Sequence, residues 1–527
     1  MPLDLLLVTL DTVRADHLGA YGGTATTPAI DALAAKGVVF DDASTTAPLT
    51  LPAHTSILTG RELADTGVRS NHDQVPATLP TGVERLAAAG YHTAAFTSGR
   101  PVARDTGLTR TFEQVDDARP DALAGQRAPA ERRGSATVAA AVAWWKATEG
   151  PRFAWVHLYD AHTPWTPTQG KGYDAELADV DRALGELLTA VGPQVAVVVV
   201  GDHGEGLGTR GEAEHGVFLY QPTVRVPLVV SVPGQPARPV ATPVSVIDVM
   251  PTLLRAAGLP EDLPGLDLLG PIPGDRRLVA ETDFPFERYG WAPLRMVRQS
   301  TVKAIDAPEP ELYDLRLDPW ETRPQPGAEV LLDDLPPRVV RSARQEDAER
   351  ARELAALGYV SGPVSTVAEP PDPKARAKLL PKLDQAQDAV FAGDHARAVR
   401  LLEVIVAEDP TNPAAHNDLG LSLQAMGDYE RALVALARAA ELAPDDAAIW
   451  SNVGVSAGRL GRLDDARRAY ERAAKLAPTN AAPCVNRAAL ELRAGEREEA
   501  RRWAEEALRR EPGMQPALDV LGQLPPR

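Results

Sequence analysis

The sequence predicts an α/β domain with a large, mostly parallel sheet, followed by an all-α solenoid of helical repeats. Over about the first 360 residues, short apolar runs alternate with amphipathic helices. That alternation is typical of a parallel sheet covered by helices on both faces. Toward the C-terminus, proline, glycine and alanine recur at a fixed spacing. The chain of 527 residues is also longer than a single domain with one hydrophobic core usually is, so more than one domain is expected.

Six apolar runs are the expected strands, and two amphipathic stretches are expected helices. The runs cover residues 4–10, 92–98, 152–159, 194–202, 227–234 and 276–283, and the helices cover residues 27–37 and 81–90. Three of these strands end in Asp or His, at Asp11, at Asp160 with His162, and at Asp202 with His203. Ligand sites of such sheets lie at the carboxyl ends of strands. The sequence therefore predicts a site built from these residues.

A 34-residue period marks the C-terminal part. It is carried by Pro410, Pro444, Pro478 and Pro512, by Gly393, Gly427, Gly461 and Gly495, and by Ala398, Ala432, Ala466 and Ala500. This pattern resembles tetratricopeptide repeats, in which each unit is a helix–turn–helix. The resemblance implies four repeats from about Lys378 to Pro512. Stacked repeats expose an extended surface, so we expect a protein partner or self-association there.

The domain boundaries follow from composition. We expect a first domain at residues 1–360, closed by a charged helix over 346–358. A linker rich in proline and serine follows at 361–377. Residues 378–527 then hold the four repeats and a capping tail.

The bulk composition excludes some functions. The net charge of −18 argues against a nucleic-acid binder, which needs a basic surface. Cys484 is the one cysteine, so no disulfide can form within the chain, which suits a reducing compartment. The N-terminus has no basic segment, and no apolar run approaches the roughly 18 residues of a membrane span. We therefore expect a cytoplasmic protein without a membrane span.

The strand-end residues point to a metal. An adjacent carboxylate and imidazole at Asp202 and His203, with Asp11 from another strand, make a set of donors for one divalent cation. Such oxygen-rich ligation with a single histidine fits calcium, magnesium, manganese or zinc.

Six motifs give the first 320 or so residues a family resemblance. They read LVTLDTVRADHLGAYG, APLTLPAHTSILTGRE, HLYDAHTPWTP, GDHGEGLGTRGEAEHGVFLYQPTVRVPLVV, DVMPTLLRAAGL and ELYDLRLDPWET. In this order they resemble a sulfatase-type member of the alkaline phosphatase superfamily. The resemblance implies an α/β sandwich with a smaller C-terminal subdomain. It also implies metal-dependent hydrolysis of sulfate or phosphate esters.

The resemblance also assigns roles to individual residues. Asp11, Asp202 and His203 match the family's metal ligands, and Thr50 falls at the position of the nucleophile, which also contacts the metal. His215 and His162 match catalytic or substrate-binding positions, and Asn71 matches a substrate contact. His54 departs from the family pattern, and two roles stay open for it: a contact with the bound anion, or a cap of the helix.

The nucleophile loop departs from the family pattern. Sulfatases carry Cys or Ser, which is oxidised to formylglycine, followed four residues later by Arg; here these positions are Thr50 and His54, and Thr12 replaces the second Asp of the N-terminal pair. Oxidation of threonine would give a ketone, so no formylglycine is expected. The hydrate of formylglycine releases sulfate by elimination, and a sulfated threonine cannot do this. A phosphorylated threonine can be hydrolysed, because water can attack its phosphorus in line. The local chemistry therefore favours phosphate esters, phosphodiesters or phosphonates.

Several alternatives stay open on the sequence alone. Asp160, His162 and His215 could hold a second cation. The enzyme could instead be a transferase that passes a phosphoryl-linked headgroup through Thr50. From a different class, the chain could be a repeat scaffold with an inactive hydrolase domain. His17, His92, His157 and His395 are expected to be structural or surface residues.

Overall fold

The computed structural model describes residues 2–119, 131–333, 335 and 367–525 and divides into two compact units. The first unit holds most of the chain up to Phe284 and resumes at Pro293. The second contains the described residues from 367 onward together with Pro285–Ala292. The expected helix over 346–358 and the linker residues 361–366 lie outside the described residues.

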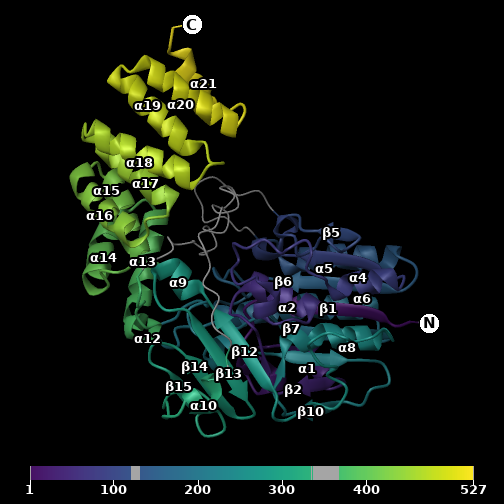
Figure 1. The fold of residues 1–527 in the computed structure, drawn as a ribbon. Coiled ribbons are helices and arrows are strands. Elements are labelled where there is room, and N and C mark those ends of the chain that lie inside the picture. Colours follow the sequence, from purple (N-terminus) through teal and green to yellow (C-terminus); the bar gives the residue numbers. More distant parts are fainter. Residues whose placement is uncertain (1, 120–130, 334, 336–366, 526–527) are drawn as a thin grey trace. The chain divides into compact units, whose positions relative to one another are not determined.

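An eight-stranded sheet forms the centre of the first unit (Figure 1). Its strand order is β10-β2-β9-β7-β1-β6-β4-β5. The strands are β1 (Asp4–Leu10), β2 (Val38–Phe40), β4 (His92–Thr97), β5 (Gln114–Asp116), β6 (Arg152–Leu158), β7 (Val195–Gly201), β9 (Leu228–Ser231) and β10 (Arg238–Val240). Every pairing is parallel except those of β9 with β2 and β7. The sheet is therefore mostly parallel, as the sequence predicts.

Helices cover both faces of this sheet, because its central strands are apolar on both sides. In β1, Leu5 and Leu7 join one core cluster, while Leu6 and Val8 join the other. The first cluster is shared with α2 (Thr50–Thr59), α4 (Gly82–Ala88) and α8 (Val249–Ala256). The second is shared with α1 (Pro28–Ala34), α5 (Gly134–Ala147) and α6 (Tyr173–Val191).

Residues 276–283 do not extend the main sheet, contrary to expectation. They form β12 (Arg277–Thr282) in a separate antiparallel sheet with β13 (Leu294–Gln299), β14 (Val302–Asp306) and β15 (Glu311–Asp314). Buried and half-buried residues alternate along β12, as suits a sheet with one face in the core. A three-stranded sheet comprises β3 (Ala43–Ser44), β8 (Arg225–Val226) and β11 (Val244–Ser245). The short helices outside the repeats are α3 (Leu63–Thr66), α7 (Gln221–Val224), α9 (Phe284–Tyr289), α10 (Glu329–Leu332) and α12 (Pro373–Arg376).

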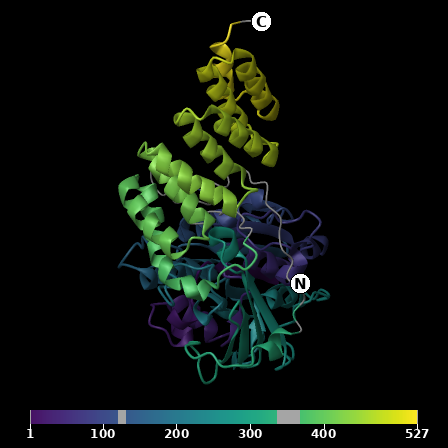
Figure 2. The ribbon, with the colours of Figure 1, turned by 60° about the vertical axis from the view of Figure 1, so that its left-hand side comes forward.

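The second unit contains four helix pairs and a final helix, stacked one after another (Figure 2). The pairs are α13 (Leu380–Phe391) with α14 (His395–Glu408), α15 (Pro413–Ala425) with α16 (Tyr429–Leu442), α17 (Ala447–Arg459) with α18 (Leu463–Leu476), and α19 (Ala482–Ala494) with α20 (Arg497–Arg510), followed by α21 (Gln515–Gly522). The period-34 glycines lie in the turns within each pair and adopt a left-handed backbone, with φ between 72° and 82°. Only glycine adopts that conformation without strain.

The period-34 alanines mark close helix contacts. Ala398, Ala432, Ala466 and Ala500 are completely buried. At Gly454 a Cβ atom would come within 2.6 Å of the Tyr470 ring, so the helices approach too closely for a side chain. No helix among the described residues is long and apolar enough to cross a membrane.

Candidate active site

Three neighbouring parallel strands end at the same place in the first unit. The amide of Asp11, after β1, donates to the Leu158 carbonyl of β6 at 2.9 Å. The amide of Asp202, after β7, donates to the Leu10 carbonyl of β1 at 3.2 Å. These bonds continue the ladder beyond the last strand residues, so the carboxyl ends meet as the sequence predicts.

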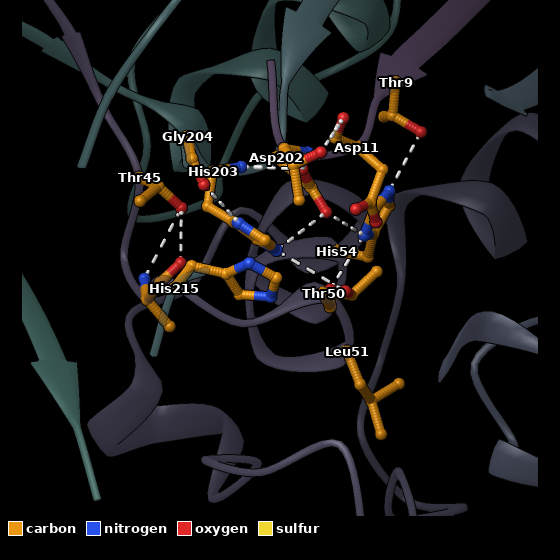
Figure 3. A network of polar contacts seen from close by, with 12 residues as sticks. Thr9, Asp11, Thr45, Thr50, Leu51, His54, Asp202, His203, Gly204 and His215 are labelled. Atoms are coloured by element: carbon orange, nitrogen blue, oxygen red, sulfur yellow. Dashed lines mark hydrogen bonds and ion pairs between the residues drawn. The ribbon is translucent and has the colours of Figure 1, made fainter. Parts of the chain in front are cut away.

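The polar side chains at these ends turn toward one another (Figure 3). Thr50 is the first residue of α2, and its Oγ1 lies 3.4 Å from Nε2 of His203. Oδ2 of Asp202 lies 3.5 Å from Nε2 of His203 and 3.5 Å from Nδ1 of His54. All of these side chains, with Asp11, are completely buried. The helix α2 begins at Thr50, so the hydroxyl lies in its first turn.

Burial shifts the acidity of this cluster toward neutral forms. Burial raises the pKa of Asp202 well above its usual value, and the nearby carboxylate of Asp11 raises it further. Burial likewise raises the pKa of Asp11, although contacts with Asp202 and Thr50 act in the opposite direction. Burial also lowers the pKa of His203 well below its usual value. The histidine is therefore a neutral imidazole with a lone pair, the form in which it binds metals.

The cluster fits a divalent cation. Oδ1 of Asp11 and Oδ2 of Asp202 accept no hydrogen bond, although both are buried. Buried carboxylate oxygens without partners are costly unless a cation lies between them. Single donor atoms of Asp11, Asp202 and His203 lie within 4.8 Å of one another, and the same holds for His54, His157 and Asp202. Carboxylate oxygens and imidazole nitrogens at this spacing could bind one divalent cation.

Comparison with known protein families identifies both parts of the chain. Residues 4–259 match the family model "Sulfatase", and residues 390–452 and 447–480 match models of the tetratricopeptide repeat. Residues 4–259 form a sulfatase-family domain. The C-terminal unit is made of tetratricopeptide repeats.

Curated relatives agree with the sulfatase assignment. The chain is 32% identical over 158 residues to the "Uncharacterized sulfatase YidJ" of Escherichia coli, a match that covers 27% of this chain and 31% of that one. It is 24% identical over 407 residues to the "Delta 4,5-hexuronate-2-O-sulfatase" of Bacteroides thetaiotaomicron, covering 61% and 84%. The chain thus spans about a third of YidJ but most of the second relative.

Solved structures share the fold of the sulfatase-family domain. A putative sulfatase from Bacteroides thetaiotaomicron is 20% identical with a TM-score of 0.54, covering 63% of this chain and 90% of that one. The phosphonate monoester hydrolase of Agrobacterium radiobacter is 22% identical with a TM-score of 0.51, covering 61% and 91%. At these identities the likeness concerns the fold alone.

His215 and His162 lie beside the cluster. The ring of His215 lies 4.3 Å from that of His203 and 5.3 Å from that of His162, measured between centroids. The ring of His162 stacks on Tyr159 at 4.5 Å, and its Nδ1 lies 2.6 Å from the Thr163 carbonyl. Nδ1 of His215 lies 3.1 Å from Oε1 of Glu205, so Nε2 is the ring nitrogen turned away from that carboxyl.

Asn71 and His54 bond to α2 itself. Oδ1 of Asn71 accepts from the Leu51 amide at 2.8 Å and so caps the first turn of the helix. Nδ1 of His54 lies 2.8 Å from the Thr50 carbonyl, and its Nε2 lies 2.9 Å from Oγ1 of Thr9. A carbonyl can only accept, so the His54 proton is on Nδ1. These bonds favour a role for both residues in holding Thr50 over contact with a substrate.

Asp160 accepts from the backbone at the start of α5. Its two carboxylate oxygens lie 3.1 and 2.8 Å from the Gly134 amide, at the start of α5. Among the described residues, neither group with ligand spacing contains Asp160, His162 or His215. The geometry therefore favours the expected mononuclear site over the alternative with a second cation at these three residues.

The geometry adds two residues that sequence reasoning did not assign to the site. Glu205 is completely buried and faces His215, and its Oε2 accepts no hydrogen bond. His157 was expected to be a structural or surface residue, yet its Nε2 lies 3.4 Å from Oδ2 of Asp11. The polarity of both residues could have indicated a place in the site. His157 is a polar residue within an apolar strand, and Glu205 comes two residues after His203.

Proposed function

We propose that this protein is a metal-dependent hydrolase of phosphate or sulfate esters in which unmodified Thr50 is the nucleophile. The observation that carries the proposal is the convergence of Asp11, Asp202 and His203 on the Thr50 hydroxyl at the first turn of α2. Membership of the sulfatase family supports ester hydrolysis, because sulfatases cleave oxyanion esters. Repeats in the second unit support an additional role in protein interaction.

The metal site has a defined set of residues. Asp11, Asp202, His203 and Thr50 would hold the cation. A divalent ion there supplies positive charge that lowers the pKa of the Thr50 hydroxyl and offsets charge on the transferred group. Thr12 stands where the family pattern has its second carboxylate, and its hydroxyl donates to the Asp11 carbonyl at 2.8 Å.

The protein's own residues perform the transfer. In the first step, the Thr50 hydroxyl loses its proton to solvent and its Oγ1 attacks phosphorus. The bond to the leaving oxygen breaks while His215 donates a proton to that oxygen. In the second step, water attacks the phosphothreonine and releases Thr50 with the product anion. His162, stacked on Tyr159 beside His215, is placed to contact the ester or to share in the proton transfer.

Threonine is the reason to favour phosphorus over sulfur. Formylglycine chemistry requires a Cβ atom that can become an aldehyde, and the threonine methyl group prevents this. Water can release a phosphothreonine by in-line attack. We therefore expect phosphomonoesters, phosphodiesters or phosphonate monoesters to be better substrates than sulfate esters.

The test is a paired substrate assay. Purified protein is given aryl sulfate, phosphomonoester, phosphodiester and phosphonate monoester substrates with manganese, magnesium, calcium or zinc, and wild type is compared with Thr50→Ala. We expect turnover of a phosphorus ester that falls by at least about a thousandfold in Thr50→Ala. Equal rates in the two proteins would contradict the nucleophile assignment. Sulfate turnover that requires Thr50 would contradict the preference for phosphorus.

A second candidate, a headgroup transferase, uses the same first step. It differs in the acceptor, because an alcohol instead of water would release Thr50. Product analysis in the presence of glycerol distinguishes the two, since a transferase forms the glycerol ester in excess over free phosphate. The third reading, a scaffold with an inactive hydrolase domain, predicts no turnover of any ester.

A further inference from the structure

The turn that follows β1 contains a residue with a strained backbone. Thr12 comes directly after Asp11 and has a φ of 54°, in the left-handed region that favours glycine. Among the described residues, four other non-glycine residues have a positive φ, and none of them is β-branched. The branched Cβ of threonine makes this conformation especially unfavourable. Because Thr12 is completely buried, the groups packed around it must hold it there.

The hydroxyl of Tyr173 is one group that holds this turn. Tyr173 is the first residue of α6, and its side chain is buried. The hydroxyl donates to the Thr12 carbonyl at 2.7 Å and accepts from the Arg14 amide at 2.8 Å. One side-chain group therefore binds the backbone on both sides of Val13, and it fixes the direction in which the chain leaves the turn.

The amide of Thr12 orients a proposed metal ligand. It donates to Oδ1 of Asp202 at 3.2 Å, and the His203 amide donates to the same oxygen at 2.7 Å. The other oxygen, Oδ2, is buried and accepts no hydrogen bond. The two amides thus determine which oxygen of Asp202 is left for a cation. The His203 amide is next to Asp202 in the sequence, whereas the Thr12 amide depends on the strained turn.

We propose that Tyr173 is a positioning residue of the metal site. Its hydroxyl holds Thr12 in the left-handed conformation and so keeps the Thr12 amide on Oδ1 of Asp202, which leaves Oδ2 for the cation. Without this hydroxyl, Thr12 relaxes toward a negative φ and its amide leaves Asp202. This inference rests on the metal site of the proposed function.

The experiment measures metal affinity, so ester turnover does not enter it. Metal-free full-length protein is titrated with manganese, magnesium, calcium or zinc in competition with a fluorescent chelator. Tyr173→Phe removes the hydroxyl and keeps the ring. Tyr91→Phe is the matched control, because the buried Tyr91 also donates to a backbone carbonyl, that of Leu3 at 2.9 Å, at the opposite end of β1 from Asp11. Thermal unfolding checks that each variant is folded.

We expect Tyr173→Phe to bind the preferred cation about 10–100-fold more weakly than wild type, as is usual when a group that orients metal ligands is lost. Tyr91→Phe should bind it within about threefold of wild type. Unchanged affinity in Tyr173→Phe would overturn the inference while leaving the metal site intact. Wild type that binds none of the four cations would overturn the metal site of the proposed function, and the inference with it.

Substitution of Thr12 separates a positioning role from a merely structural one. In a Thr12→Gly background, removal of the Tyr173 hydroxyl should weaken metal binding by less than about threefold, because glycine keeps a positive φ without strain. In a Thr12→Val background, which keeps the branched Cβ, the full loss should remain. Equal losses in the two backgrounds would overturn the inference, because they would show that the hydroxyl does not act through the Thr12 backbone.

A comparison of two single variants does not depend on the folding of Tyr173→Phe. Thr12→Gly and Thr12→Ala both remove the side chain beyond Cβ. At an ordinary backbone position alanine gives the more stable protein, whereas glycine does so where φ is positive. We therefore expect Thr12→Gly to unfold at a temperature equal to or above that of Thr12→Ala. A clearly lower temperature for Thr12→Gly would show that Thr12 is not strained and would overturn the inference.

Discussion

The two units of the molecule satisfy their polar groups in opposite ways. In the sulfatase-family domain, the bonds around the site join distant parts of the chain, as when the Thr12 amide donates to Asp202, 190 residues away. In the repeats, side chains cap their own helices three residues on, as Asp428 does for the Arg431 amide. Local capping ends each helix within its own repeat, whereas the site needs the whole sheet. The difference separates a part built for chemistry from a part built for regular stacking.

The largest expected effect concerns a buried ion pair in the first unit. Nζ of Lys303 in β14 lies 2.5 Å from Oε1 of Glu321, and both side chains are completely buried. Lys303→Met leaves the Glu321 charge without its partner, which costs about 3–5 kcal/mol. Urea unfolding, read from hydrogen exchange of β14 amides, measures this change. Lys36→Met, on the exposed surface, is the control and should be nearly neutral.

A double variant sharpens this prediction. If Glu321→Gln is added to Lys303→Met, no charge remains buried, so most of the lost stability should return. A double variant as unstable as the single one would show that the packing of the lysine, and not the charge, supports the small sheet.

A smaller effect is expected at Glu205, which faces His215. Glu205→Gln keeps the size of the side chain but replaces the carboxyl group that faces Nδ1 of His215 and orients the imidazole. We expect kcat to fall about 10–100-fold, with KM within a few-fold of wild type. Steady-state kinetics on the substrate found in the paired assay check this. Glu113→Gln, at a half-exposed position, is the control, and equal kcat in all three proteins would refute the positioning role.

The smallest effect is expected in the repeats. Asp428→Ala removes the cap of α16 and should cost about 1 kcal/mol of stability in the second unit. Asp428→Asn should be nearly neutral, because asparagine caps a helix equally well. Ester hydrolysis should not change in either variant. A loss of hydrolysis in Asp428→Ala would contradict this separation of the two units, because it would show that the stability of the repeats affects catalysis.

Much of the fold was predictable because its signals are local or periodic. Strand residues of β1, β6 and β7 are mostly apolar, and the repeat period follows from Gly393, Gly427, Gly461 and Gly495 in their turns. Residues 276–283 were assigned to the wrong sheet, because an apolar run does not identify its partner strand. Pairing of β12 with β13 depends on contacts that the run itself does not encode.

The sequence by itself determined the two architectures and the meeting of three strand ends. Only the tertiary structure placed His157 against Asp11, turned Asn71 and His54 toward α2, and paired Glu205 with His215. The physical reason is that strand and helix patterns record burial along the chain. The distance between side chains depends instead on strand register and on packing between elements far apart in the sequence.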